Sequence, residues 1–92
     1  MYHLITIGGG AAGFFGSITA AENGAESVLM LEKSSKLLGK VKVSGGGRCN
    51  VTHHCFDPRE LSKHYPRGEK SLIGPLHGWG AQDTVDWFQS RG

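Results

Sequence analysis

A glycine-rich turn near the start of the chain carries the clearest chemistry. Residues 8–13 read GGGAAG, and Gly8, Gly10 and Gly13 match the GxGxxG pattern of dinucleotide-binding turns. In that pattern the first glycine permits the tight turn and the second lets the backbone approach a pyrophosphate. The third lets the following helix pack closely on the strand. The pattern therefore predicts a helix whose N-terminal N–H groups face phosphates.

An acidic residue follows the turn at the distance that this pattern requires. Glu32 comes directly after the apolar run 28–31, about 20 residues beyond the glycines. A carboxylate there can accept hydrogen bonds from both hydroxyls of an adenosine ribose. Together with the small residues Ala11 and Ala12 inside the turn, Glu32 completes the first half of a candidate cofactor site. A glycine-rich turn without a ligand is the alternative.

The elements around these residues indicate the fold class. The apolar run 4–7 predicts a strand, and three apolar residues spaced four and three apart predict one helix face: Phe14, Ile18 and Ala21. Ser17 is small where the helix must lie close to a neighbour, and Gly24 can end the helix in the left-handed conformation. A second strand over 28–31 completes a Rossmann-like βαβ unit. We therefore expect an α/β fold.

The segment 33–50 is basic and contains a second group of glycines. It holds five cations and no acidic residue: Lys33, Lys36, Lys40, Lys42 and Arg48. Because the segment begins directly after the candidate ribose-binding acid, its cations can lie near two phosphates. The glycines, which follow Ser44, can turn several backbone N–H groups toward an anion or a ring carbonyl: Gly45, Gly46 and Gly47. A flexible loop is the alternative.

Length and composition restrict the class of protein further. Ninety-two residues allow one domain, and a net charge of +2 is too small to imply a nucleic-acid partner. No run of about 18 apolar residues predicts a membrane span, and no signal peptide is visible, so we expect a cytoplasmic protein. A doubly wound sheet needs a third strand. We therefore expect residues 1–92 to be the N-terminal part of a larger nucleotide-binding domain, completed by the rest of the polypeptide.

The cysteines and histidines predict neither a metal site nor a catalytic thiol. The spacing of Cys49, His53, His54 and Cys55 fits none of the usual zinc-ligand patterns. Cys49 follows the second group of glycines but lacks the partner of a CxxC pair. A small packed side chain is the simpler interpretation of Cys49.

The second half of the chain predicts short helices and loops. Asp57 is a suitable N-cap, with proline at the next position and Glu60 placed for a capping box. That helix should end by Tyr65, because a proline follows. We read the rest of 56–80 as loop, with three residues contributing to a core: Leu72, Ile73 and Leu76. A final helix is expected over 82–91.

Several strings of residues resemble flavoproteins of the BaiN/YhiN type, which are NAD(P)/FAD-dependent or aminoacetone-oxidase-like oxidoreductases. The strings are GGGAAG at 8–13, LEK at 31–33 and, above all, SGGGRCNVT at 44–52. Two more resemble the next segments of that family: YPRG at 65–68 and DTVDWF at 83–88. The similarity thus covers essentially the whole chain.

The resemblance implies that the first glycine turn binds FAD. Gly8, Gly10, Ala12 and Gly13 would meet the pyrophosphate and Glu32 the ribose. Lys33 and Lys40 would lie near the adenine or the phosphates, and the segment from Ser44 through Cys49 to Asn50 would run toward the flavin. Arg48 is the best candidate for a cation near the phosphates or the flavin ring.

The function that the resemblance implies is the FAD-binding portion of a flavin-dependent oxidoreductase. In the complete protein NAD(P)H would supply electrons through regions outside this chain, and a small unsaturated or carbonyl compound would accept them. No residue of this chain is predicted as a general acid or base. The alternatives are an NAD-binding dehydrogenase domain, since Glu32 suits either cofactor, and a truncated non-catalytic nucleotide-binding module. A flavoprotein that acts on RNA is a weaker alternative because the net charge is small.

Overall fold

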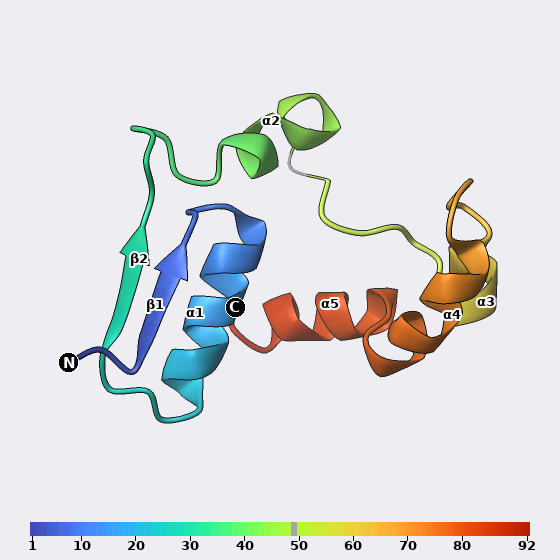
Figure 1. Ribbon diagram of the computed structural model, residues 1–92. Helices are drawn as coiled ribbons and strands as arrows, with labels where there is room; N and C mark the ends of the chain where they lie inside the picture. Colours follow the sequence, from blue (N-terminus) through green and yellow to red (C-terminus); the bar gives the residue numbers. More distant parts are fainter. Residues whose placement is uncertain (49) are drawn as a thin grey trace. The chain divides into compact units, whose positions relative to one another are not determined.

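The computed structural model describes residues 1–48 and 50–92, so Cys49 lies outside the described residues. The chain divides into two compact units, Met1–Asn50 and Val51–Gly92. The first unit contains β1 (Leu4–Ile7), α1 (Ala11–Glu22), β2 (Val28–Leu31) and α2 (Gly39–Gly47) (Figure 1). The second contains α3 (Pro58–Ser62), α4 (Glu69–Gly78) and α5 (Ala81–Gln89). No helix in the described residues is long and apolar enough to cross a bilayer.

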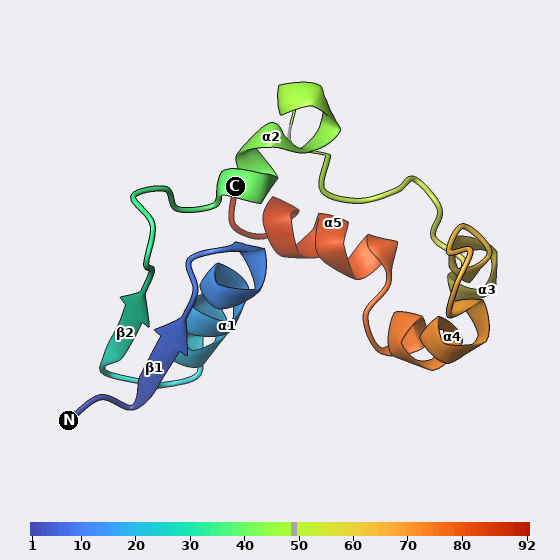
Figure 2. The same ribbon diagram turned by 45° about the horizontal axis from the view of Figure 1, so that its top comes forward.

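The first unit is built on a parallel βαβ arrangement. β1 and β2 pair in parallel, with Leu4 opposite Val28 and Ile7 opposite Leu31. α1 connects the strands and lies along one face of the pair (Figure 2). The helix ends as expected, because Asn23 is its C-cap and Gly24 has a φ of 99°. These observations confirm the predicted α/β, Rossmann-like fold class.

Small residues form the closest contact between α1 and β1. A Cβ at Gly13 would lie 3.2 Å from Thr6 Cγ2, and Ser17 Oγ is 2.8 Å from Thr6 Oγ1. Of the predicted apolar face, Phe14 is half-buried, whereas Ile18 and Ala21 are exposed. All three residues lie in the predicted helix, and the close approach predicted at Ser17 is confirmed.

The opposite face of the strand pair is apolar and exposed. Ile5, Ile7 and Leu31 are 51%, 80% and 48% exposed. Side chains alternate along a strand, so these residues lie on the face away from Thr6 and α1. Parallel sheets are normally covered on both faces. In the described part of the first unit, this face is left open for further packing.

α2 is an element that the sequence did not predict. Its helical part is interrupted at Ser44, whose φ and ψ are −63° and 151°. Gly45, Gly46 and Gly47 follow with φ values of 58°, 66° and 87°. These are left-handed conformations, which residues with a Cβ rarely adopt. The three glycines therefore form a left-handed turn at the end of a short helix.

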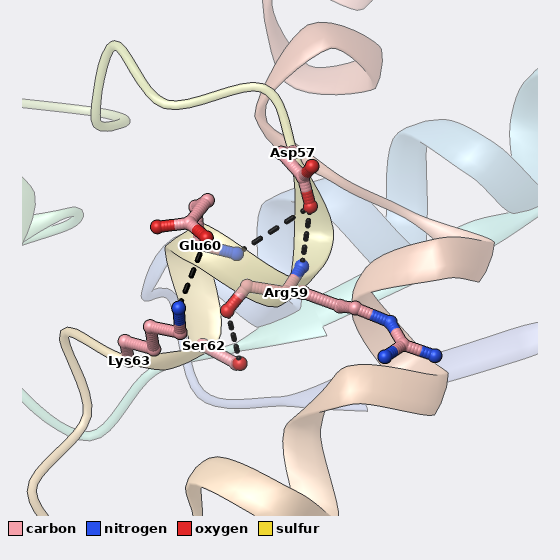
Figure 3. Close-up of polar contacts among 5 residues, drawn as sticks. All are labelled: Asp57, Arg59, Glu60, Ser62 and Lys63. Carbon is pink, nitrogen blue, oxygen red and sulfur yellow. Dashed lines mark hydrogen bonds and ion pairs between the residues drawn. The ribbon is translucent and has the colours of Figure 1, made fainter.

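α3 begins at the predicted cap. Asp57 Oδ1 accepts hydrogen bonds from the backbone N–H groups of Arg59, at 2.8 Å, and Glu60, at 3.4 Å (Figure 3). The capping box was not correct, because the Glu60 carboxylate instead pairs with Lys63 Nζ at 3.0 Å. Ser62, whose Oγ donates to the Arg59 carbonyl, is fully buried in this unit. The cap thus fixes the start of a helix that contributes to the small core.

Replacement of Asp57 by alanine should lower the free energy of unfolding by about 0.5–2 kcal/mol. Two N–H groups at the start of α3 lose their acceptor in this variant. Chemical denaturation measures the change. Asp57→Asn is the matched control, since its side-chain oxygen can accept the same bonds. Equal stability of Asp57→Ala and the unsubstituted protein would contradict the proposed cap.

The structure has a helix, α4, where the sequence predicted a loop. A helix runs through Glu69–Gly78, with Pro75 inside it. Gly74 and Pro75 have weak helix propensity, and the helix that contains them contacts α3. The expected core residues Leu72, Ile73 and Leu76 are half-buried. The final helix is confirmed to within two residues at each end.

Candidate dinucleotide site

The three glycines of the pattern lie in three different structural settings. Gly8 has a φ of 106°, which favours glycine for its backbone alone. A Cβ at Gly13 would overlap the Gly8 carbonyl oxygen, so packing of α1 requires glycine there. Gly10 has ordinary extended angles of −96° and −167°, and a Cβ would meet nothing within 4 Å. Neither backbone nor neighbour explains Gly10, which leaves open space beside the turn.

The N-terminus of α1 is free to face an anion. Gly10 is the N-cap and provides no side-chain cap, and the first turn contains no acidic residue. Ala11 and Ala12 are exposed. The first N–H groups of a helix have no partner within the helix, and the helix dipole favours negative charge there. The open space at Gly10 and these donors together suit a phosphate group.

The Glu32 carboxylate is held against the glycine turn. Its Oε1 accepts from the Gly9 N–H at 3.0 Å, and its Oε2 accepts from the Ser34 N–H at 2.7 Å. These hydrogen bonds lower the pKa of Glu32 below its ordinary value. The bond from the Gly9 N–H is the main cause, and the bonds from Ser34 are the second. Each carboxylate oxygen keeps a further lone pair. A charged acceptor is thus fixed beside the turn, where a ribose would need it.

The lowered pKa of Glu32 predicts a pH-dependent contribution to stability. Because the folded-state pKa lies below the unfolded one, this contribution is complete above the unfolded pKa. It is lost as the pH falls through the folded pKa. Unfolding free energies of the protein and of Glu32→Gln, measured across the acidic range, should therefore converge as the pH falls. A difference that stays constant with pH would show that the carboxylate charge is not involved.

Gly9 is a residue of this site that the sequence reasoning missed. It is buried, and both its N–H and its carbonyl are hydrogen-bonded outside the turn, to Glu32 and to Leu38. The pattern GxGxxG accepts any residue at this position, so no sequence signal marked it. Leu38 was missed for a similar reason, since only its backbone takes part.

The structure shows no hydrogen bond from the predicted residues of the basic segment to the glycine turn within the described residues. Lys33, Lys40 and Arg48 are exposed, and the Lys63–Glu60 ion pair involves none of them. Ser44 Oγ donates to the Val41 carbonyl at 2.7 Å. No hydrogen bond within the described part of the chain joins residues 44–50 to residues 8–13.

Gly45, the first residue of the second group of glycines, lies close to Asn50. A Cβ at Gly45 would lie 2.7 Å from Asn50 Cβ, so these two predicted residues are brought together. Cys49 was predicted beside them and lies outside the described residues. The described residues contain no group of three His, Cys, Asp or Glu side chains able to hold a metal.

The second unit contains a pocket that the sequence did not predict. Its volume is about 230 Å³. Aromatic, aliphatic and hydroxyl side chains line it, and Trp79 Nε1 donates to Thr84 Oγ1 at 2.9 Å. The lining residues are Val51, Thr52, His53, Leu61, Tyr65, Leu76, Trp79, Gly80, Ala81 and Thr84.

The fold and the glycine turn together define a dinucleotide-binding Rossmann domain. The helix N-terminus, the open space at Gly10 and the acid after β2 are the parts that such a domain needs. The family model described as the HI0933-like protein Rossmann domain matches residues 2–92. The chain belongs to this family, which confirms the resemblance found in its motifs.

The curated proteins that the chain is similar to are named as two kinds of enzyme. The chain is 35% identical over 85 residues to the ribosomal RNA dihydrouridine synthase of Escherichia coli, covering 92% of this chain and 21% of that protein. It is 32% identical over 93 residues to the 3-dehydro-bile acid delta(4,6)-reductase of Clostridium scindens, covering 100% and 22%. The chain thus spans about a fifth of the length of these relatives. No solved structure matches it.

Proposed function

We propose that this chain is the FAD-binding portion of a flavin-dependent oxidoreductase. The observation that carries the proposal is the open space at Gly10, the N-cap of α1, which lets a group approach the backbone beside the first N–H groups of the helix. The pyrophosphate would lie at the start of α1, and Glu32 would accept hydrogen bonds from the ribose. FAD, when bound, supplies the redox chemistry, whereas the chain binds and orients it.

The remaining predicted site residues have supporting roles in this proposal. Lys33 and Lys40 would lie on the adenine or phosphate side, and Arg48 would place a positive charge near the phosphates or the flavin ring. NAD(P)H would act as electron donor through regions outside this chain. The relative named a reductase supports reduction of an unsaturated small molecule.

We further propose that residues 1–92 are part of a larger domain of a cytoplasmic protein. The exposed apolar face of Ile5, Ile7 and Leu31 supports this, because further segments of the same polypeptide would cover it. So does the greater length of the relatives.

The first experiment is an absorption spectrum of the purified full polypeptide, followed by release and identification of its cofactor. Flavin bands, with FAD released on denaturation, are the expected result. A colourless protein that binds NAD would instead assign the turn to a dehydrogenase domain. A full polypeptide that binds neither dinucleotide would contradict the proposal.

RNA is the second candidate substrate. Relatives named ribosomal RNA dihydrouridine synthase favour it, whereas the net charge of +2 favours a small molecule. Mass spectrometry of ribosomal RNA from cells lacking the gene separates the two. Loss of a dihydrouridine would indicate that ribosomal RNA is the substrate, and unchanged RNA would support a small-molecule substrate.

A further inference from the structure

The peptide groups of Gly9 are held from two sides by the segment that follows β2. The Gly9 N–H donates to Glu32 Oε1 at 3.0 Å, and its carbonyl accepts from the Leu38 N–H at 2.7 Å. Gly9 is buried, although Gly8 is half-buried and Gly10 exposed. The middle of the glycine turn is therefore fixed by two bonds from outside the turn.

The side chain of Leu37 lies over the same residue. A Cβ at Gly9 would be 2.5 Å from Leu37 Cδ2 and 3.4 Å from Glu32 Cβ. Leu37 is 55% exposed, so it covers the turn from the surface. Glu32, Leu37 and Leu38 together enclose Gly9, and we call them the Gly9 clasp.

Leu38 has an unusual backbone conformation within this clasp. Its φ and ψ are 54° and 33°, and it is the one non-glycine residue with a positive φ in the described chain. This conformation is disfavoured for a residue with a Cβ and persists where surrounding contacts fix it. Those contacts are the bond to Gly9 and the bond from the Lys42 N–H to the Leu38 carbonyl, at 2.9 Å. Leu38 thus joins the glycine turn to the start of α2.

We propose that Leu38 is a positioning residue whose backbone N–H holds the glycine turn ready for the cofactor. The inference rests on the proposed function, because it concerns the same dinucleotide site. A turn fixed in advance loses little conformational freedom when the ligand binds, which raises affinity. Leu38 acts through Gly9 rather than by touching the ligand.

Three substitutions in the full polypeptide separate the N–H from the side chain. Leu38→Pro removes the N–H and fixes φ near −65°. Leu38→Ala keeps the N–H and removes most of the side chain, and Leu38→Gly keeps the N–H and adopts the left-handed conformation readily. Titration of cofactor-free protein with FAD should show affinity lowered at least about tenfold in Leu38→Pro. The other two variants should stay within about threefold of the unsubstituted protein.

The titrations distinguish a failure of the inference about Leu38 from a failure of the proposed function. An unsubstituted protein that binds no FAD contradicts the function, whereas a folded Leu38→Pro variant that binds FAD normally overturns the role of Leu38. Loss of affinity in Leu38→Ala and Leu38→Gly, equal to that in Leu38→Pro, would overturn it too.

Amide hydrogen exchange of Leu38 keeps the inference testable if Leu38→Pro does not fold. In cofactor-free, unsubstituted protein the Leu38 N–H should exchange slowly, because the Gly9 carbonyl already accepts its hydrogen bond. Rapid exchange that slows only when FAD is added would show that the cofactor orders the turn, and would overturn the inference. Slow exchange without FAD supports it, whichever dinucleotide the site takes.

Discussion

Replacement of Gly10 by valine should lower the FAD affinity of the full polypeptide at least about 100-fold, or about 2.8 kcal/mol. The added side chain would occupy the open space where the pyrophosphate must approach the backbone. A Cβ at this position meets nothing within 4 Å, and the backbone angles suit any residue, so the fold should be retained. Flavin fluorescence during titration of cofactor-free protein measures the affinity.

Gly16→Val is the matched control for this experiment. It places the same side chain on α1, where a Cβ likewise meets nothing within 4 Å, but away from the start of the helix. It should keep the affinity of the unsubstituted protein. Normal FAD binding by Gly10→Val would remove the main support for the pyrophosphate site, while equal losses in both variants would indicate a general effect on α1.

Replacement of Gly13 by alanine should destabilise the protein by about 3 kcal/mol, the upper part of the range for overpacked sites. The new Cβ would overlap the Gly8 carbonyl oxygen, which is backbone and cannot rotate away. It would also press on Thr6 Cγ2, so α1 would have to move off β1. Chemical denaturation gives the free energy of unfolding.

Gly16→Ala provides the opposite expectation within the same helix. Its Cβ has free space, and alanine favours a helix over glycine by about 1 kcal/mol, so stability should rise. The two substitutions are chemically identical, and only the neighbours of the new Cβ differ. A stable Gly13→Ala variant would mean that α1 does not lie as close to β1 as described.

Local patterns in the sequence were sufficient for the βαβ elements of the first unit, β1, α1 and β2. The strand at 4–7, the helix that stops before Gly24 and the strand at 28–31 followed from apolar spacing and glycine chemistry. The cap at Asp57 was predictable for the same reason, because its bonds join residues two and three positions apart. The role of each pattern glycine was predictable in kind, although only the structure shows what each Cβ would meet.

The helix α4, which the sequence missed, makes contacts with another element. α4 includes glycines and Pro75 and packs on α3, and propensity alone could not indicate that contact. The small residues Gly13 and Ser17 at the contact of α1 with β1 were predicted, but only the structure shows that Thr6 is their partner.

The sequence by itself determined the family, the βαβ order and the candidate residues Gly8, Gly10, Gly13 and Glu32, because residue type and spacing carry that information. Only the tertiary structure decided that Glu32 accepts from the Gly9 N–H and that the Leu38 N–H donates to the Gly9 carbonyl. The physical reason is that Gly9 and Leu38 take part through backbone groups, which almost every residue possesses. The folded path of the chain selects these two residues, and their residue types do not mark them in the sequence.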